Sequence, residues 1–165
     1  MNEGVEWAAH VCLLLHWLHE GDATLPPAPV PAPVPVARLA DAYDLPSPYL
    51  VKQIQALTRA GVTESVPGKN GGVRLARPAD RITLMDVVAA IEGPEDAFAC
   101  TEIRQRGMNE GRPARDFARP CGIAHAMRGA ELAWRRELAA TSILDLATST
   151  PRRIAADARR HFARA

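Results

Sequence analysis

The feature that most constrains the fold is a hairpin signal enclosed by helical sequence. In VTESVPGKNGGVRLAR two short β-prone pieces flank GKNGG, residues 68–72, whose glycines permit the positive φ angles of a tight turn. The preceding PYLVKQIQALTRAG repeats apolar residues with the helical period, and so does the following ITLMDVVAAIEG. We therefore expect one two-stranded hairpin inserted into an otherwise helical chain.

The chain before the hairpin predicts three helices and a proline-rich insertion. Residues 5–20 and VARLADAY at 36–43 have helical apolar spacing, and the third helix spans residues 48–59. Between the first two, LPPAPVPAPVPV at 25–36 contains six prolines, which exclude a helix and favour polyproline II. We interpret this stretch as a stiff insertion, with a ligand for a proline-recognition module as the alternative.

Residues that start and stop helices agree with these boundaries. Ser47 is the predicted N-cap of the third helix, Pro48 is tolerated in its first turn, and Gly61 follows its end. Thr83 is a plausible cap for ITLMDVVAAIEG, and Gly93 stops it. Each of these two helices is therefore expected to have defined ends.

The rest of the chain adds a charged loop and a long helix. Residues 94–120 are irregular, a long helix is expected from Gly122 to Ala140, and a short TSILDLA segment and a basic tail follow. We expect the tail to form a solvated helix, with contact to DNA phosphates as the alternative. The element order is that of a winged helix-turn-helix, mainly α with a small β-hairpin wing, followed by a long C-terminal helix. The expected divisions are 1–93 for the winged helix-turn-helix, 94–121 for the loop, 122–147 for the region of the long helix and 148–165 for the basic tail.

Two elements of this unit carry the side chains expected to contact DNA. The helix at 48–59 would enter the major groove, and the GKNGG wing would approach a phosphate or the minor groove. The alternative is a protein-interaction module in which the same unit only packs. The predicted exposed, DNA-contacting residues are Arg38, Ser47, Tyr49, Lys52, Gln53, Arg59, Lys69, Asn70 and Arg74.

Composition excludes several other classes of protein. With 20 Lys and Arg against 19 Asp and Glu, the chain has no overall basicity, so any DNA-binding surface must be local. No apolar run is long enough to span a membrane, and the acidic start does not resemble a signal peptide, so a cytoplasmic location is expected. GKNGG lacks the spacing and the Ser or Thr of a phosphate-binding loop, and no nucleophile–base pair stands out. We expect neither an enzyme nor a small-molecule substrate.

The motifs on the winged unit resemble one known family. SPYLVKQIQALTRAGV and GKNGGVRLARPADRITLMDVVAAIEGP are similar to the signature of the Rrf-type winged-helix repressors, the IscR/NsrR/RsrR group. The resemblance covers about residues 4–147, interrupted by the proline insertion. It implies a homodimer that crosses through the long C-terminal helix and reads a palindromic operator in double-stranded DNA.

The resemblance also implies an iron–sulfur sensor, with one departure. The usual three closely spaced cysteines are absent, because only Cys100 and Cys121 lie between EGP and the long helix, 21 positions apart. GVEWAAH and FACTEIRQRG instead look like the RsrR-like variant, in which two cysteines, a glutamate and a histidine hold a [2Fe–2S] cluster. The resemblance thus points to Glu6, His10, Cys100 and Cys121 as ligands. It also implies that 94–121 is the cluster-binding loop and that 122–147 is the dimerisation region with its long C-terminal dimerisation helix.

The chemistry of these four residues leaves alternatives open. Glu6 and His10 are one helical turn apart, in line with the expected buried face of the first helix, and two thiolates would complete a four-ligand set. The same set suits Zn²⁺, while a thiol switch or a protein without metal is also compatible. Glu6 and His10 alone would form an ordinary helix-surface pair. We expect Cys12 in the core, His125 as the substitute ligand, and surface positions for His16, His19 and His161.

These observations predict a dimeric winged-helix transcription regulator, most simply a repressor, that senses redox state or nitric oxide through a [2Fe–2S] cluster. The alternative function is a winged-helix interaction module with a structural zinc site or thiol switch and no DNA binding.

Overall fold

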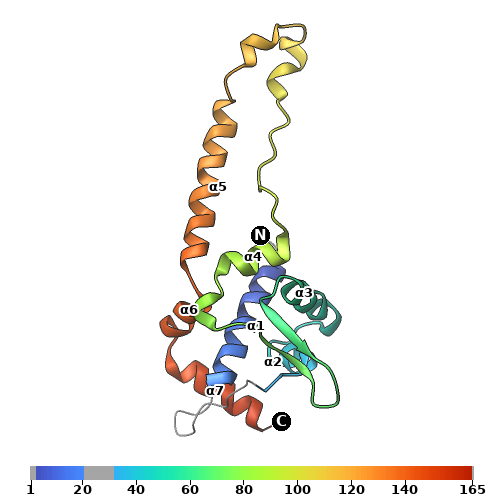
Figure 1. The fold of residues 1–165 in the computed structure, drawn as a ribbon, viewed down its shortest axis with the longest axis vertical. Coiled ribbons are helices and arrows are strands. Elements are labelled where there is room, and N and C mark those ends of the chain that lie inside the picture. The colour runs from blue at the N-terminus through green and yellow to red at the C-terminus, as the bar shows by residue number, and fades with distance from the viewer. Residues whose placement is uncertain (1–2, 21–31, 165) are drawn as a thin grey trace. The chain divides into compact units, whose positions relative to one another are not determined.

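The computed structural model describes residues 3–20 and 32–164 and divides the chain into two compact units (Figure 1). The larger unit combines Met1–Pro94 with Leu138–Ala165, and the smaller unit is Glu95–Glu137. Within the described residues, no helix is long and apolar enough to cross a membrane.

The described elements are mostly helical, with one antiparallel two-stranded sheet, which confirms the predicted fold class. The larger unit contains the winged helix-turn-helix order of two helices and a hairpin, preceded by the first helix. Its elements are α1 (Glu3–Glu20), α2 (Val36–Ala42), α3 (Ser47–Arg59), β1 (Thr63–Val66), β2 (Gly72–Leu75), a 3₁₀ turn (Ala79–Arg81), α4 (Leu84–Glu92), α6 (Ile143–Ser149) and α7 (Arg152–Ala163). The smaller unit has three 3₁₀ turns (Ile103–Gln105, Gly107–Asn109, Ala114–Phe117) and most of α5 (Gly122–Ala140).

Helix α1 is the centre of the core of the larger unit. It contacts α3, α4, α6 and α7, and this enclosure buries Val11, Cys12 and Leu14 almost completely. Leu57 of α3 and Ile143 of α6 are fully buried in the same cluster. Burial of side chains of this size stabilises a fold by about 1.5–3 kcal/mol each, so this cluster holds α3 and the hairpin in place.

Side-chain caps fix two helix starts. At α4, Thr83 Oγ1 accepts from the Asp86 N–H at 3.1 Å, and the Asp86 carboxylate accepts from the Thr83 N–H at 2.8 Å. Ser142 and Asp145 form the same capping box at the start of α6. The predicted Thr83 cap is confirmed, and hydrogen bonding explains why each helix begins where it does.

The prediction that Ser47 caps α3 is wrong by one residue. The carbonyl of Pro46 accepts from the Tyr49 N–H at 3.0 Å and the Leu50 N–H at 3.1 Å, so Ser47 already lies inside the helix. Pro46 is the N-cap and no side chain caps it.

The hairpin forms as predicted, and the end of the proline-rich segment pairs with it. Strand β1 pairs with β2 in the register Thr63↔Leu75 to Val66↔Gly72. Val34 then exchanges two backbone hydrogen bonds of 2.9 Å with Val73 of β2. Polyproline II was expected for residues 25–36, of which 25–31 lie outside the described part of the chain.

The basic tail forms helix α7, which packs on the larger unit instead of being solvated all round. Ala155 is buried, and Phe162 packs against the core. The Arg38 guanidinium lies 4.7 Å from the centre of the Phe162 ring and donates to the Phe162 carbonyl at 2.7 Å. Arg159 donates to the carbonyl of Trp17 at 3.2 Å. The expectation of a solvated tail is therefore wrong for this face of α7.

Candidate functional site

Helix α3 presents one polar face to solvent. Leu50, Gln53, Ile54 and Leu57 form its buried side, at the i, i+3, i+4 and i+7 positions of a helix. The prediction that Gln53 is exposed is wrong, because its place in this spacing turns it inward and leaves it 8% exposed. The residues left exposed are Pro48, Tyr49, Val51, Lys52, Gln55 and Arg59. Gln55 was missed by sequence reasoning, although it follows Lys52 at i+3.

The wing places two of its predicted residues in solvent and engages the third. Lys69 and Asn70 are exposed in the turn between β1 and β2. Arg74 is half-buried and its guanidinium donates to Glu64 on the opposite strand, its register partner. The wing tip therefore presents Lys69 as a cation, while the Arg74 charge is offset by Glu64.

Two further predicted DNA contacts are only partly accessible. Ser47 is half-buried at the start of α3. Arg38 is also half-buried and is held by the carbonyl and ring of Phe162. The guanidinium of Arg38 thus joins α2 to α7.

Glu6 and His10 are both exposed on α1, in contrast to the expected place on its buried face. The buried side of the first turns is formed by Val5, Ala8 and Val11 instead, which leaves the glutamate and the histidine turned outward. The His10 ring lies 5.6 Å from the ring of Tyr43, centre to centre. Both side chains are accessible as ligands, one helical turn apart.

The aromatic residue between Glu6 and His10 contacts helix α3. Trp7 is half-buried and meets Tyr49 of α3 edge to face, with ring centres 5.5 Å apart. Trp7 therefore joins the start of α1 to an exposed residue of the predicted DNA-contacting face.

In the smaller unit, an arginine lies near both cysteines. Cys100 is exposed and Cys121 is half-buried. The pKa of Arg104 is raised, first by its hydrogen bond to Glu102, and also by negative charge on the Cys121 and Cys100 sulfurs. The same hydrogen bond lowers the pKa of Glu102.

Several contacts hold Arg104 in this position. Its Nη2 donates to Glu102 Oε2 at 2.8 Å and to the Arg119 carbonyl at 3.2 Å, and its guanidinium lies 5.7 Å from the Phe117 ring centre. Glu102 has a left-handed φ of 50°, an uncommon conformation that turns the chain between Cys100 and Arg104. Arg104 was not identified from the sequence, because no local pattern distinguishes it from the other arginines of the loop.

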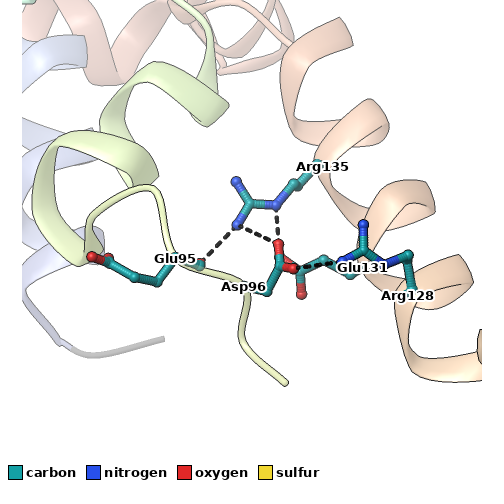
Figure 2. Close-up of polar contacts among 5 residues, drawn as sticks. All are labelled: Glu95, Asp96, Arg128, Glu131 and Arg135. Atoms are coloured by element: carbon teal, nitrogen blue, oxygen red, sulfur yellow. Dashed lines mark hydrogen bonds and ion pairs between the residues drawn. The ribbon is translucent and has the colours of Figure 1, made fainter. Parts of the chain in front are cut away.

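Figure 2 shows a polar network that ties the start of the cysteine loop to α5. Arg135 donates to Glu131 at 2.7 Å and to the Glu95 carbonyl at 2.9 Å. Asp96 lies 3.4 Å from Arg128 and 3.9 Å from Arg135. The i, i+4 spacing of Glu131 and Arg135 is visible in the sequence, but their link to residues 95 and 96 is not.

The remaining histidines and Cys12 divide between core and surface. Cys12 is in the core as predicted, and burial raises the pKa of its thiol to about 12. His161 and His125 are exposed. The prediction for His16 is wrong, since α6 and α7 cover this side of α1 and leave the residue 7% exposed.

The two halves of the predicted ligand set lie in different units. Glu6 and His10 belong to the larger unit, and Cys100 and Cys121 to the smaller. Among residues 3–20 and 32–164, no group of three or more histidine, cysteine or acidic side chains is placed to hold a metal ion.

Comparison with known proteins supports the winged-helix assignment. The chain is 41% identical to "Protein aau3" of Rhizobium meliloti (strain 1021) over 116 residues, which cover 70% of this chain and 71% of that protein. The fold is similar to that of CymR (YrzC), the global cysteine regulator of B. subtilis, with a TM-score of 0.63, 21% identity, and coverage of 92% of this chain and 98% of that one. It is also similar to T. potens IscR, with a TM-score of 0.61, 18% identity, and coverage of 92% and 88%.

The family match extends over most of the chain. Residues 2–149 match Rrf2, described as "Iron-dependent Transcriptional regulator". This match confirms the expectation of a DNA-binding transcription regulator in place of an enzyme. The chain belongs to the Rrf2 family of transcriptional regulators.

Proposed function

We propose that this regulator senses redox state or nitric oxide through a [2Fe–2S] cluster held by Glu6, His10, Cys100 and Cys121. The observation that carries the proposal is the accessibility of both halves of the ligand set. Glu6 and His10 are exposed one turn apart on α1, and the two thiols share Arg104. Because IscR and CymR both resemble this fold, the fold alone does not select the sensor.

Each ligand has a distinct electrostatic role. When bound, the cluster supplies reversible one-electron chemistry, and nitrogen ligation raises its potential above that of an all-thiolate site. His10 would ligate through a nitrogen of its neutral imidazole. Glu6 adds one negative charge, and Arg104 offsets thiolate charge at Cys100 and Cys121.

We further propose that the regulator acts as a homodimer on a palindromic operator. Ile123 and Met127 lie one helical turn apart on α5 and are 68% and 43% exposed, so they form an apolar surface that a second copy of the chain would cover. Two copies related by a two-fold axis would present two α3 helices to two half-sites.

The DNA contacts follow from the exposed surfaces. Tyr49, Lys52 and Arg59 of α3 are proposed for the major groove, and Lys69 and Asn70 of the wing for the backbone. Ser47 is proposed as a contact at the start of α3. We propose that Arg38, Gln53 and Arg74 hold the DNA-contacting elements in position instead of contacting DNA. Each is at least half-buried or paired within the protein.

The cluster is tested by anaerobic purification followed by iron and acid-labile sulfide analysis. We expect two irons and two sulfides per chain and a visible absorption spectrum, as the composition of a [2Fe–2S] cluster requires. His10→Ala should lose or destabilise this cluster and keep the helical circular-dichroism spectrum.

His125→Ala is the matched control, since His125 is also an exposed histidine on a helix. If His125→Ala loses iron while His10→Ala retains it, His125 and not His10 is the histidine ligand. Equal operator affinity of oxidised and reduced protein with an intact cluster would refute the sensing role. If metal analysis finds zinc instead of iron, the site is a structural metal site and not a redox sensor.

A thiol switch is the second candidate, favoured by the position of Arg104. The Arg104 guanidinium interacts with both Cys100 and Cys121, and a thiol reacts with oxidants as the nucleophilic thiolate. Oxidation of metal-free protein with diamide distinguishes this reading. A Cys100–Cys121 disulfide that changes DNA affinity would support the switch, whereas oxidation without such a change would reject it.

A further inference from the structure

A cavity of about 690 Å³ lies at the C-terminal end of α1, where α6 and α7 meet it. All residues lining it belong to the larger unit and are among those described. Its volume is within the range of about 300–1,000 Å³ found for small-molecule sites. Neither the proposed cluster ligands nor the exposed face of α3 contributes to it.

The cavity wall contains two histidines with buried nitrogen atoms that have no hydrogen-bond partner. His16 is 7% exposed, and its Nε2 lacks a partner, as does Nδ1 of His19. The Glu20 carboxylate is 3.5 Å from His16 Nε2 but lacks the alignment of a hydrogen bond. Buried polar groups in proteins are normally paired, so this wall has hydrogen-bonding capacity that the described residues leave unused.

Charge around the cavity favours an anion. Arg152 and Arg159 line it from α7, and Glu20 is the only carboxylate among its lining residues. The hydrogen bond from Arg159 to the Trp17 carbonyl fixes that guanidinium against α1. Arginine is suited to a planar oxyanion group, because its fork of donors matches two oxygens.

The remaining wall is apolar. Trp17, Leu144, Ala147 and Ala155 line the same cavity. We propose that this cavity binds a small organic carboxylate, with Arg152 and Arg159 as the cations for its charged group and Trp17 and Leu144 against its apolar part. The site goes beyond the proposed cluster sensing and requires neither iron nor DNA.

Residues that line this cavity also line a second cavity next to the wing. A second cavity of about 460 Å³ shares His16, His19 and Leu144 with the first. Its other wall includes Arg74, at the end of β2, and Arg77. A ligand that moves either imidazole therefore alters the surroundings of the wing.

The test uses NMR of the imidazole groups and backbone amides of the full chain, titrated with sodium butyrate at constant ionic strength. We expect saturable shifts of the His16 and His19 resonances, with smaller shifts at the amides of residues 74–77. Sodium chloride serves as the ionic control, and inorganic phosphate is titrated as a separate anion. Absence of saturation, or phosphate binding as tight as butyrate binding, would overturn the proposal.

Variants of neighbouring arginines separate the site from general charge effects. Arg152→Gln should weaken butyrate binding about tenfold, as expected for loss of one hydrogen bond to a charged group. Arg153→Gln is the matched control, since Arg153 is exposed on the same helix and does not line the cavity. Leu144→Trp should weaken binding, because the larger side chain occupies part of the cavity on its apolar side without a change of charge. Equal weakening by both arginine variants, or unchanged binding in Leu144→Trp, would also overturn the site.

Discussion

Replacement of Gly72 by alanine should detach the end of the proline-rich segment from the wing. A Cβ atom at Gly72 would lie 2.3 Å from the carbonyl carbon and oxygen of Val34 and 2.7 Å from the nitrogen of Pro35. All three are backbone atoms, so the clash cannot be relieved by turning a side chain. Relief requires Val34 to move away from Val73, which breaks their two hydrogen bonds.

The magnitude follows from these contacts. Two backbone hydrogen bonds with net values of about 0.5–1.5 kcal/mol each give a loss of about 1–3 kcal/mol. Gly72 also has a φ of 157°, which adds conformational strain for alanine. Gly68 provides the control, because its φ is 109° but an added Cβ would meet no atom within 4 Å. Gly68→Ala therefore reports conformational strain without the clash.

The assay is urea unfolding of wild type, Gly72→Ala and Gly68→Ala at one protein concentration. We expect Gly72→Ala to lose about 1–3 kcal/mol more free energy of unfolding than Gly68→Ala, from the two hydrogen bonds. Hydrogen exchange of the Val34 amide gives an independent measure, and its protection should fall only in Gly72→Ala. Equal free energies of unfolding for the two variants, with the Val34 amide still protected, would show that the added Cβ does not displace Val34.

Three further predictions concern a thiol, a carboxylate and a lysine. Iodoacetamide at pH 8 should modify Cys100 and spare Cys12 until the chain unfolds, because burial raises the Cys12 pKa to about 12; mass spectrometry gives the order. Burial alone would raise the pKa of Asp86, but hydrogen bonds from Thr83 and the charge of Arg77 outweigh it and lower the pKa. Asp86 thus stabilises the fold above its unfolded pKa, and this stability is lost as pH falls through the folded pKa. Asp86→Asn should therefore reduce the loss of unfolding free energy at acidic pH, measured by urea unfolding at several pH values. Lys69→Gln should reduce the slope of log affinity for DNA against log salt by about 1, because Lys69 is proposed to contact a phosphate, whereas an unchanged slope would remove Lys69 from the contact.

Local sequence signals predicted the elements well. Periodic apolar residues identified α1, α3, α4 and α5, and the glycine-containing turn identified the hairpin. The capping box at Thr83 also follows from neighbouring residues. These features depend on interactions within a few positions of the chain, which a single sequence displays directly.

Contacts between distant residues were not predictable in the same way. The burial of His16 depends on α6 and α7, more than a hundred positions further along the chain. The contact of Arg38 with Phe162 and the pairing of Val34 with Val73 also join residues that are distant in the sequence. For the candidate site, Cys100 and Cys121 were predicted from the sequence but Arg104 was not. The proximity of Arg104 to the two cysteines depends on how the loop folds.

The larger unit is discontinuous in sequence, and this affects its folding during synthesis. Its core needs Ile143, whose N–H donates to the Ile82 carbonyl at 2.8 Å and whose side chain is fully buried. Residues 95–137 separate the two parts, so the ribosome completes α3 and the wing well before α6 and α7 are available. Until then the apolar side of α1 that α6 and α7 cover stays open. A nascent chain halted within α5 would therefore contain a complete helix α3 on an incomplete core. Its exposed apolar surface is the kind that chaperones bind.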